Sequence, residues 1–138
     1  MTVVKVLQDI WILNESGIVL FSRVFNPKVN EQLFGALMTA LNSFATELAK
    51  GGLSSFELSS IRFTIYKDKG LLFVSNSAKK VKEKKVQDEL KIIAKKFFTK
   101  YAGVLASWDS DVNMFADFND DIEESLEDTI KKFQDAFW

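Results

Sequence analysis

The stretch IWILNESGIVLFSR, residues 10–23, decides the fold of this 138-residue chain. It contains two apolar runs rich in β-branched and aromatic residues, and the segment 14–17 between them has the composition of a turn. This arrangement predicts a β-hairpin. Because the two runs are nearly unbroken in apolar residues, we expect both faces of the sheet that contains them to be covered.

The rest of the chain alternates between helix and strand patterns, and its length fits one domain, residues 1–138, with one core. The predicted elements are strands at 10–13 and 18–25, a helix at 31–50, strands at 56–58, 61–66 and 71–74, a basic helix capped by Ser75–Ser77, and an acidic helix from about Val112. This order, β-β-α-β-β-β-α-α, predicts an α+β fold with a five-stranded, mostly antiparallel sheet.

Each predicted helix carries an apolar stripe at helical spacing. We expect these stripes to pack on the sheet, because an amphipathic helix buries its apolar side. The stripes are Leu33, Leu37, Ala40, Leu41, Phe44 and Leu48 in the first helix, Val86, Leu90, Ile93, Ala94, Phe97 and Tyr101 in the basic helix, and Phe115, Phe118, Ile122, Leu126, Ile130 and Phe133 in the acidic helix.

Charge is distributed unevenly along the chain. Residues 79–100 contain nine lysines and three acidic residues, whereas residues 109–138 contain ten acidic residues and two lysines. The two helices that these segments predict are adjacent in sequence, so we expect them to lie side by side and to compensate each other's charge.

The chain contains neither cysteine nor histidine. This composition removes disulfides, thiolate nucleophiles, the commonest general base at neutral pH and the commonest metal ligand. No Walker-type phosphate loop, dinucleotide fingerprint or nucleophile elbow occurs. We therefore expect a protein that is not an enzyme and has no cofactor.

One acidic segment resembles part of a metal site. Asp109–Asn113 is similar to the opening of a calcium-binding loop, but Met114 occupies the position where that loop needs glycine. We interpret Asp109 and its neighbours as a helix cap, and we expect no metal site.

The first helix provides the most informative candidate for a partner-binding surface. Beside its apolar stripe, the remaining arc is small and uncharged, and interface cores are depleted of charge. We expect this arc to face outward and to contact another protein, although a helix buried beneath a loop or a sheet edge would show the same pattern. The predicted partner-binding residues are Phe34, Gly35, Met38, Thr39, Asn42, Ser43 and Thr46.

A lysine cluster supports an alternative function, peripheral binding to anionic lipid. No aromatic residue that could stack on a base lies among these lysines, so we expect no nucleic-acid binding. The cluster consists of Lys79, Lys80, Lys82, Lys84 and Lys85.

The location expected from the sequence is the cytoplasm. No apolar run approaches the about 20 residues that a spanning helix needs, and the first residues do not resemble a secretion leader. Membrane contact is therefore expected to be peripheral at most.

The order of elements, together with residues 10–23, resembles the longin family, whose fold is profilin-like and SNARE-like. The shared pattern is an apolar strand, a turn that ends in Gly17, and a strand that ends near Phe21-Ser22-Arg23. Roadblock domains have a related sheet but begin with a helix, whereas this chain begins with a strand. Longin is therefore the closer resemblance.

The resemblance implies a central sheet with the 31–50 helix on one face and the two later helices on the other. It also implies a non-catalytic platform that forms homodimers or heterodimers and binds a small Ras-like GTPase in vesicle trafficking. No coiled-coil segment or membrane anchor follows the domain in this sequence, so a stand-alone member is expected rather than a SNARE.

Overall fold

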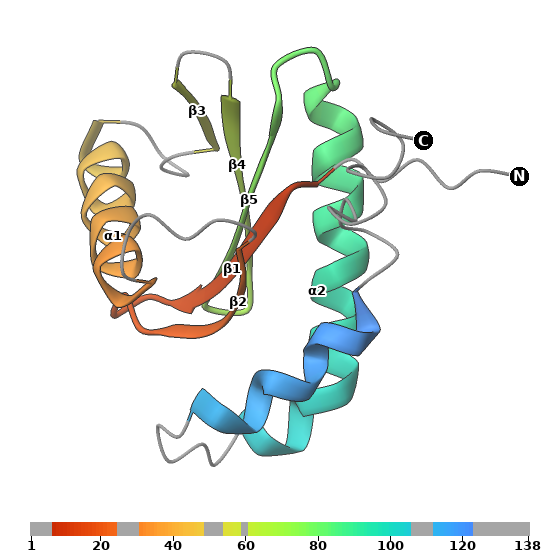
Figure 1. Ribbon diagram of the computed structural model, residues 1–138. Helices are drawn as coiled ribbons and strands as arrows, with labels where there is room; N and C mark the ends of the chain where they lie inside the picture. The colour runs from red at the N-terminus through yellow and green to blue at the C-terminus, as the bar shows by residue number, and fades with distance from the viewer. Residues whose placement is uncertain (1–6, 25–30, 49–53, 59–60, 106–111, 123–138) are drawn as a thin grey trace, which may run out of the picture.

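The computed structural model describes residues 7–24, 31–48, 54–58, 61–105 and 112–122 (Figure 1). Within this part of the chain the elements follow the predicted order. They are β1 (Asp9–Asn14), β2 (Val19–Arg23), α1 (Glu31–Leu48), β3 (Ser55–Leu58), β4 (Ile61–Asp68), β5 (Leu71–Ala78), α2 (Glu83–Leu105) and the 3-10 helix η1 (Val112–Asp121).

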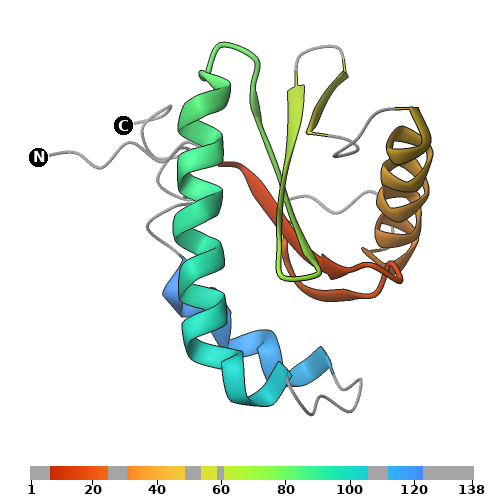
Figure 2. The ribbon, with the colours of Figure 1, turned by 180° about the vertical axis from the view of Figure 1, so that it is seen from behind.

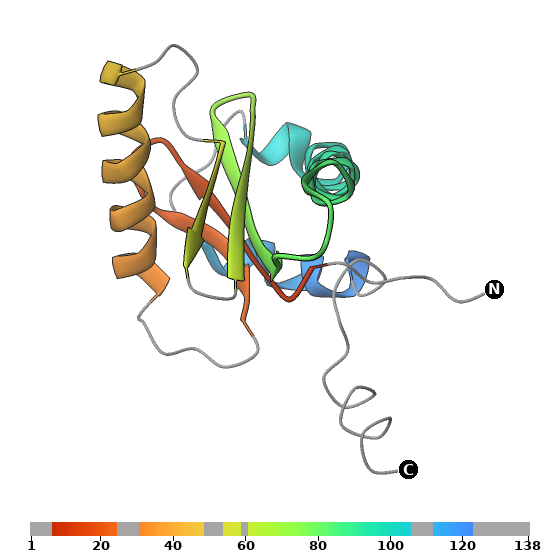
Figure 3. The same ribbon diagram turned by 90° about the horizontal axis from the view of Figure 1, so that it is seen from above.

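The five strands form one antiparallel sheet in the order β2-β1-β5-β4-β3. Helix α1 covers one face, and α2 with η1 covers the other (Figure 3). The predicted fold class is therefore confirmed. Leu126, Ile130 and Phe133, which were predicted to continue the acidic helix, lie outside the described residues.

The hairpin predicted from residues 10–23 is present, and Asn14 organises its turn. The side-chain Oδ1 of Asn14 accepts hydrogen bonds from the backbone amides of Ser16 (2.9 Å) and Ile18 (3.0 Å). Gly17 has a φ of +88°, which is a conformation that favours glycine. The turn that the composition of residues 14–17 predicts is therefore stabilised by hydrogen bonds to the Asn14 side chain.

The larger core lies between the sheet and α2 with η1, which lies beside the C-terminal half of α2 (Figure 2). Phe97 and Phe118 meet edge to face with ring centroids 5.1 Å apart, and Phe118 meets Phe21 in the same way at 5.4 Å. All six residues of the stripe predicted for the basic helix are buried, as are Phe115, Phe118 and Ile122. The inward faces of these two helices were therefore predicted correctly.

Strand β5 extends further than the sequence predicted. Ser75–Ser77 was expected to end the strands and cap a helix, but β5 continues to Ala78 and α2 begins at Glu83. The polar side chains fit inside the sheet because they bond to β1: Ser75 Oγ donates to the Asp9 carbonyl (2.6 Å), and Asn76 Nδ2 donates to Asp9 Oδ2 (2.9 Å). The predicted strand end at residue 74 is wrong for this reason.

Helix α1 is rotated relative to the prediction. Gly35 is buried against the backbone of Gly17, and Met38 is only 2% exposed. The stripe that was expected to face the sheet is exposed instead. The prediction for this helix is wrong because the closest approach to the sheet is made through a residue that has no side chain.

The contact between Gly35 and Gly17 leaves no space for a side chain on the helix. A Cβ atom at Gly35 would lie 2.2 Å from the carbonyl oxygen of Gly17 and 2.8 Å from Val19 Cγ2. Because the first of these neighbours is backbone, α1 and the hairpin would have to move apart to accept even a methyl group. This contact therefore fixes where α1 sits on the sheet.

Gly35→Ala is accordingly expected to lower the free energy of unfolding by about 1–3 kcal/mol, the usual cost of overpacking. Gly103→Ala is the matched control, because Gly103 also lies in a helix and nothing lies within 4 Å of its added Cβ. The control is expected to be stabilising by up to about 1 kcal/mol, since alanine has the higher helix propensity. Urea unfolding measures both, and a Gly35→Ala variant as stable as Gly103→Ala would contradict the contact.

Helices α2 and η1 are joined by a charged network. The hydroxyl of Tyr101 donates to Asp117 Oδ1, and Lys100 Nζ lies 3.4 Å from Asp117 Oδ2 and 2.6 Å from Asp121 Oδ2. The hydrogen bond from Tyr101, followed by the one from Lys100, lowers the pKa of the Asp117 carboxyl, while burial raises the pKa of the Tyr101 hydroxyl. The predicted pairing of a basic with an acidic helix is thus realised on this flank of α2.

This network predicts a pH dependence of stability. Because folding lowers the pKa of Asp117, its contribution is present above the ordinary value of 3.8 and is lost as the pH falls through the lowered value. Asp117→Asn is therefore expected to lose less stability than the wild type when urea midpoints are compared between about pH 7 and about pH 2. Asp120→Asn, an exposed carboxylate of the same helix, is the control and should follow the wild type; identical profiles for all three proteins would refute the network.

Candidate functional site

The exposed side of α1 is the least expected surface of the molecule. Five large apolar side chains lie on it in a row: Leu33 (64% exposed), Leu37 (52%), Leu41 (37%), Phe44 (66%) and Leu48 (74%). These residues are called the α1 face below. A surface helix normally turns its charged residues to the solvent, so five such side chains on one helix make this face a candidate interaction surface.

The sequence of α1 reinforces this interpretation. The helix contains only two charged residues, Glu31 and Glu47, and neither belongs to the α1 face. This lack of charge is visible in the sequence, but periodicity alone assigns the apolar stripe to the core. The signal that could have corrected the assignment is Gly35, because glycine inside a helix costs about 1 kcal/mol and usually marks a close backbone contact.

The two edges of the sheet differ in accessibility. At β2 the side-chain amide of Gln32 bonds to both backbone groups of Val19: Oε1 accepts from the amide (3.1 Å) and Nε2 donates to the carbonyl (3.3 Å). Strand β3 is the other edge, and its outer side pairs with no strand of the described chain. An edge strand with unpaired backbone groups can accept another strand.

An aromatic row connects the open edge to α1. Phe56 of β3 stacks on Phe63 of β4 with ring centroids 4.8 Å apart, Phe63 lies 6.2 Å from Phe34, and Phe34 stacks on Trp11 at 4.2 Å. Phe56, Phe63 and Phe34 are only partly buried. The aromatic row therefore links β3 to the sheet-facing side of α1, and Figure 1 shows α1 and β3 on the left side of the molecule.

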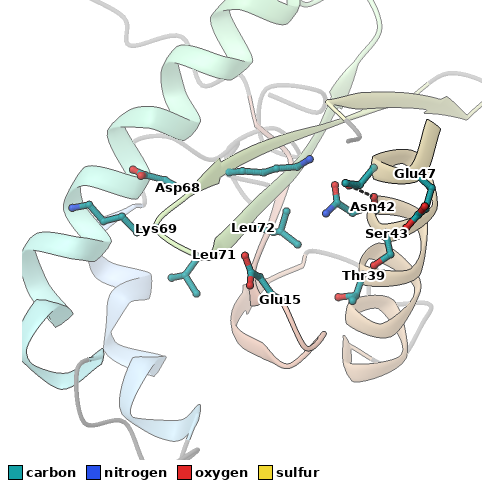
Figure 4. Close-up of a pocket in the computed structure, with 12 residues that line it drawn as sticks. Glu15, Thr39, Asn42, Ser43, Glu47, Asp68, Lys69, Leu71 and Leu72 are labelled. Atoms are coloured by element: carbon teal, nitrogen blue, oxygen red, sulfur yellow. Dashed lines mark hydrogen bonds between the residues drawn. The ribbon is translucent and has the colours of Figure 1, made fainter. Parts of the chain in front are cut away.

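The structure divides the seven predicted partner-binding residues into two groups. Three of them pack toward the sheet: Gly35 and Met38 are buried, and Phe34 stacks on Trp11. The expectation that they face outward is wrong. The other four line a groove of about 500 Å³ between α1 and the turn that joins β4 to β5 (Figure 4): Thr39, Asn42, Ser43 and Thr46.

The walls of this groove combine polar side chains with Leu71 and Leu72. Thr46 Oγ1 donates to the carbonyl of Asn42 (2.8 Å), whereas the buried Thr39 Oγ1 has no hydrogen-bond partner among the described residues. On the opposite wall, burial lowers the pKa of Lys67. The hydroxyl and amide groups can hydrogen-bond a partner segment, and their role in binding stays a prediction.

The lysine cluster lies in the segment between β5 and α2 and in the first residues of α2. Lys79 Nζ is 3.3 Å from Glu57 Oε2, and Arg62 bonds to the other carboxylate oxygen and to the carbonyls of Lys79 and Val81. The hydrogen bonds from Lys79 and then Arg62 lower the pKa of Glu57. Lys79 therefore links the end of β5 to β3 through Glu57. The other lysines of the cluster are exposed: Lys80, Lys82, Lys84 and Lys85. Lipid binding by this cluster stays a prediction.

Among the described residues, no group of three or more histidine, cysteine, aspartate or glutamate residues could hold a metal ion. No helix in the same part of the chain is long and apolar enough to cross a membrane.

Comparison with solved structures shows the fold. A roadblock/LC7 domain from Streptomyces avermitilis is similar with a TM-score of 0.57 and 16% identity, over 70% of this chain and 86% of that one. The gliding protein MglB from Thermus thermophilus is similar with a TM-score of 0.50 and 14% identity, over 60% of this chain and 70% of that one. At these identities the likeness concerns the architecture alone.

Comparison of the sequence with curated proteins gives no match. Comparison with protein families gives a match over residues 8–103, which include the hairpin, α1, the whole sheet and most of α2. The resemblance carried by residues 10–23 is thereby confirmed. This chain belongs to the longin family described as the first longin domain of FUZ, MON1 and HPS1.

Proposed function

We propose that this protein is a non-catalytic interaction module that dimerises through the α1 face and the β3 edge, and that the dimer binds a small Ras-like GTPase in a process such as membrane traffic. The observation that carries the proposal is the α1 face, five large apolar side chains exposed in one row. The absence of histidine and cysteine supports a role in binding rather than in catalysis.

The energetics favour an extended interface over a single contact. Full burial of one Leu or Phe side chain is worth about 1.5–3 kcal/mol, whereas association costs about 4–15 kcal/mol of translational and rotational freedom. Several residues of the α1 face must therefore be buried together. Strand pairing at β3 would add directional hydrogen bonds and fix the register.

A second copy of this chain is the partner that the surface fits best. A two-fold axis brings the same patch of each copy together, so the patch must complement itself. The α1 face meets this condition because it contains no charge that would repel its own copy. An edge strand meets it as well, since a two-fold axis perpendicular to the sheet pairs β3 with its own copy in antiparallel orientation.

The GTPase part of the proposal rests on the longin family, to which the chain belongs, and on the groove beside the α1 face. The groove residues Thr39, Asn42, Ser43 and Thr46 do not belong to the α1 face, so the proposed dimer would leave the groove open. Their uncharged hydrogen-bonding groups suit a protein surface, where about one hydrogen bond forms per 100–200 Å².

Leu37→Glu combined with Phe44→Glu is expected to convert the dimer into a monomer, because two carboxylates would have to be buried without partners. Light scattering after size-exclusion chromatography measures the mass. Ile92→Glu is the matched control: Ile92 is 46% exposed, but it lies on α2. This control should remain dimeric, whereas a wild-type monomer, or dissociation of both variants alike, would contradict the dimer interface.

The GTPase partner is tested separately, so that its failure can be told from failure of the dimer. The wild-type protein is mixed with the small Ras-like GTPases of the same organism, loaded with GDP or a GTP analogue, and the mass is measured again. A stable complex that is lost in Leu37→Glu/Phe44→Glu is expected. A dimer that binds none of them in either state would contradict the GTPase role and leave the dimer interface standing.

A further inference from the structure

A second hollow, of about 320 Å³, lies on the opposite face of the sheet, between α2 and the turn from β4 to β5. Its walls come from β4 and the turn on one side and from one flank of α2 on the other. Figure 4 shows Asp68 and Lys69 extending from the turn on the α2 side. The lining residues are Tyr66, Asp68, Lys69, Lys91, Lys95, Phe98 and Thr99.

The lysines of this hollow differ from the paired lysines of the molecule. Lys100 pairs with Asp117 and Asp121, and Lys79 pairs with Glu57. In the described part of the chain, by contrast, no ion pair involves Lys69, Lys91 or Lys95. Helix η1 compensates only the flank of α2 that carries Lys100, so positive charge remains uncompensated around the hollow, where Asp68 is the one carboxylate among the described lining residues.

The geometry of the hollow is fixed by the fold. Lys69 has a φ of 48° in the tight turn before Gly70, and its Nζ lies 4.8 Å from the centre of the Phe98 ring. Lys91 and Lys95 are four residues apart on α2 and therefore lie on one side of the helix. Three lysines from two elements thus line the hollow together with the aromatic residues Tyr66 and Phe98.

We propose that this hollow binds a phosphate monoester group, carried either by a small soluble molecule or by a lipid headgroup. Ammonium groups form short, charge-assisted hydrogen bonds with phosphate oxygens, and the lining residues also include Tyr66 and Thr99, whose side chains carry hydroxyl groups. The volume lies at the lower end of the range for small-molecule sites, about 300–1,000 Å³. The hollow lies apart from the α1 face, so the inference is independent of dimerisation.

The shape favours a compact anion over a polymer. The hollow borders an interior strand and a turn, so it offers no sheet edge to which an acidic peptide could add as a strand. Phe98 is already covered by Lys69, which leaves that ring less available for stacking on the bases of a nucleic acid. Three lysines and one aspartate give the hollow a net charge of about +2, which a single group with two negative charges would neutralise.

The test uses two probes that each carry a phosphate monoester, glycerol 3-phosphate in solution and vesicles that contain phosphatidic acid, each at one fixed salt concentration. Vesicles with the same fraction of phosphatidylserine serve as the reference, because that lipid is anionic but lacks a phosphate monoester. We expect Lys91→Gln/Lys95→Gln to weaken binding by about tenfold or more through loss of charge-assisted hydrogen bonds. Binding is measured by phosphorus NMR titration and by vesicle co-sedimentation.

Lys84→Gln/Lys85→Gln is the matched control for the soluble probe, since it removes the same charge from the same helix but lies outside the hollow. The control is expected to change binding of the soluble probe by less than about twofold. Both lysines belong to the predicted lipid-binding cluster, so the phosphatidylserine vesicles are the reference in the lipid experiment. Binding of glycerol 3-phosphate without vesicle binding supports a soluble ligand, and preference for phosphatidic acid over phosphatidylserine supports a lipid headgroup. Binding of neither probe, or equal loss in both variants while circular dichroism shows both to be folded, overturns the site.

Discussion

The backbone contact between Gly17 and Gly35 is the constraint on which the functional surfaces of this molecule depend. It joins the turn of the first hairpin to the first half of α1, and it has no room for a side chain on Gly35. With this point fixed, Met38 fills the space above the sheet and Phe34 stacks on Trp11. The α1 face then has no orientation left except toward the solvent, beside the open β3 edge.

The periodicity of apolar residues was sufficient to predict the sheet and the order of elements. It also predicted which side of α2 and of η1 faces the core. In α2 the apolar residues alternate with lysines, so only one side can be buried. In α1 both sides are uncharged, and periodicity cannot decide which of two uncharged sides faces the sheet. The orientation of α1 is set by a contact between residues 17 and 35. These residues are far apart in the sequence, so no local pattern reveals the contact. The end of β5 was missed for a related reason, since Ser75 and Asn76 have turn-like composition but find their partners on β1.

The candidate site lies on the helix that the sequence singled out, which carries few charges in a chain rich in lysine and glutamate. Its role in binding a partner stays a prediction. The residues were divided differently by the fold: four line the groove and three hold α1 on the sheet. The expected charge compensation was also partial, since Lys100 meets η1 while Lys91 and Lys95 remain around a hollow. The two faces of the sheet therefore carry different surfaces, the exposed apolar side of α1 on one face and a hollow lined by lysines on the other. The two proposals assign a different kind of partner to each.

The proposed dimer interface requires a particular orientation of α1. The side of the helix that carries Gly35 must pack on the sheet, and the large apolar side chains of the α1 face must point to the solvent. The chain contains no cysteine, so a single introduced thiol reports on one position only. The rate of thiol modification can therefore be compared in Leu37→Cys and Met38→Cys, two adjacent positions, at protein concentrations below those at which dimers form. We expect rapid reaction at position 37 and a reaction at least about a hundredfold slower at position 38, which becomes accessible only when the structure opens. Equal rates, or faster reaction at position 38, would show that α1 is oriented differently.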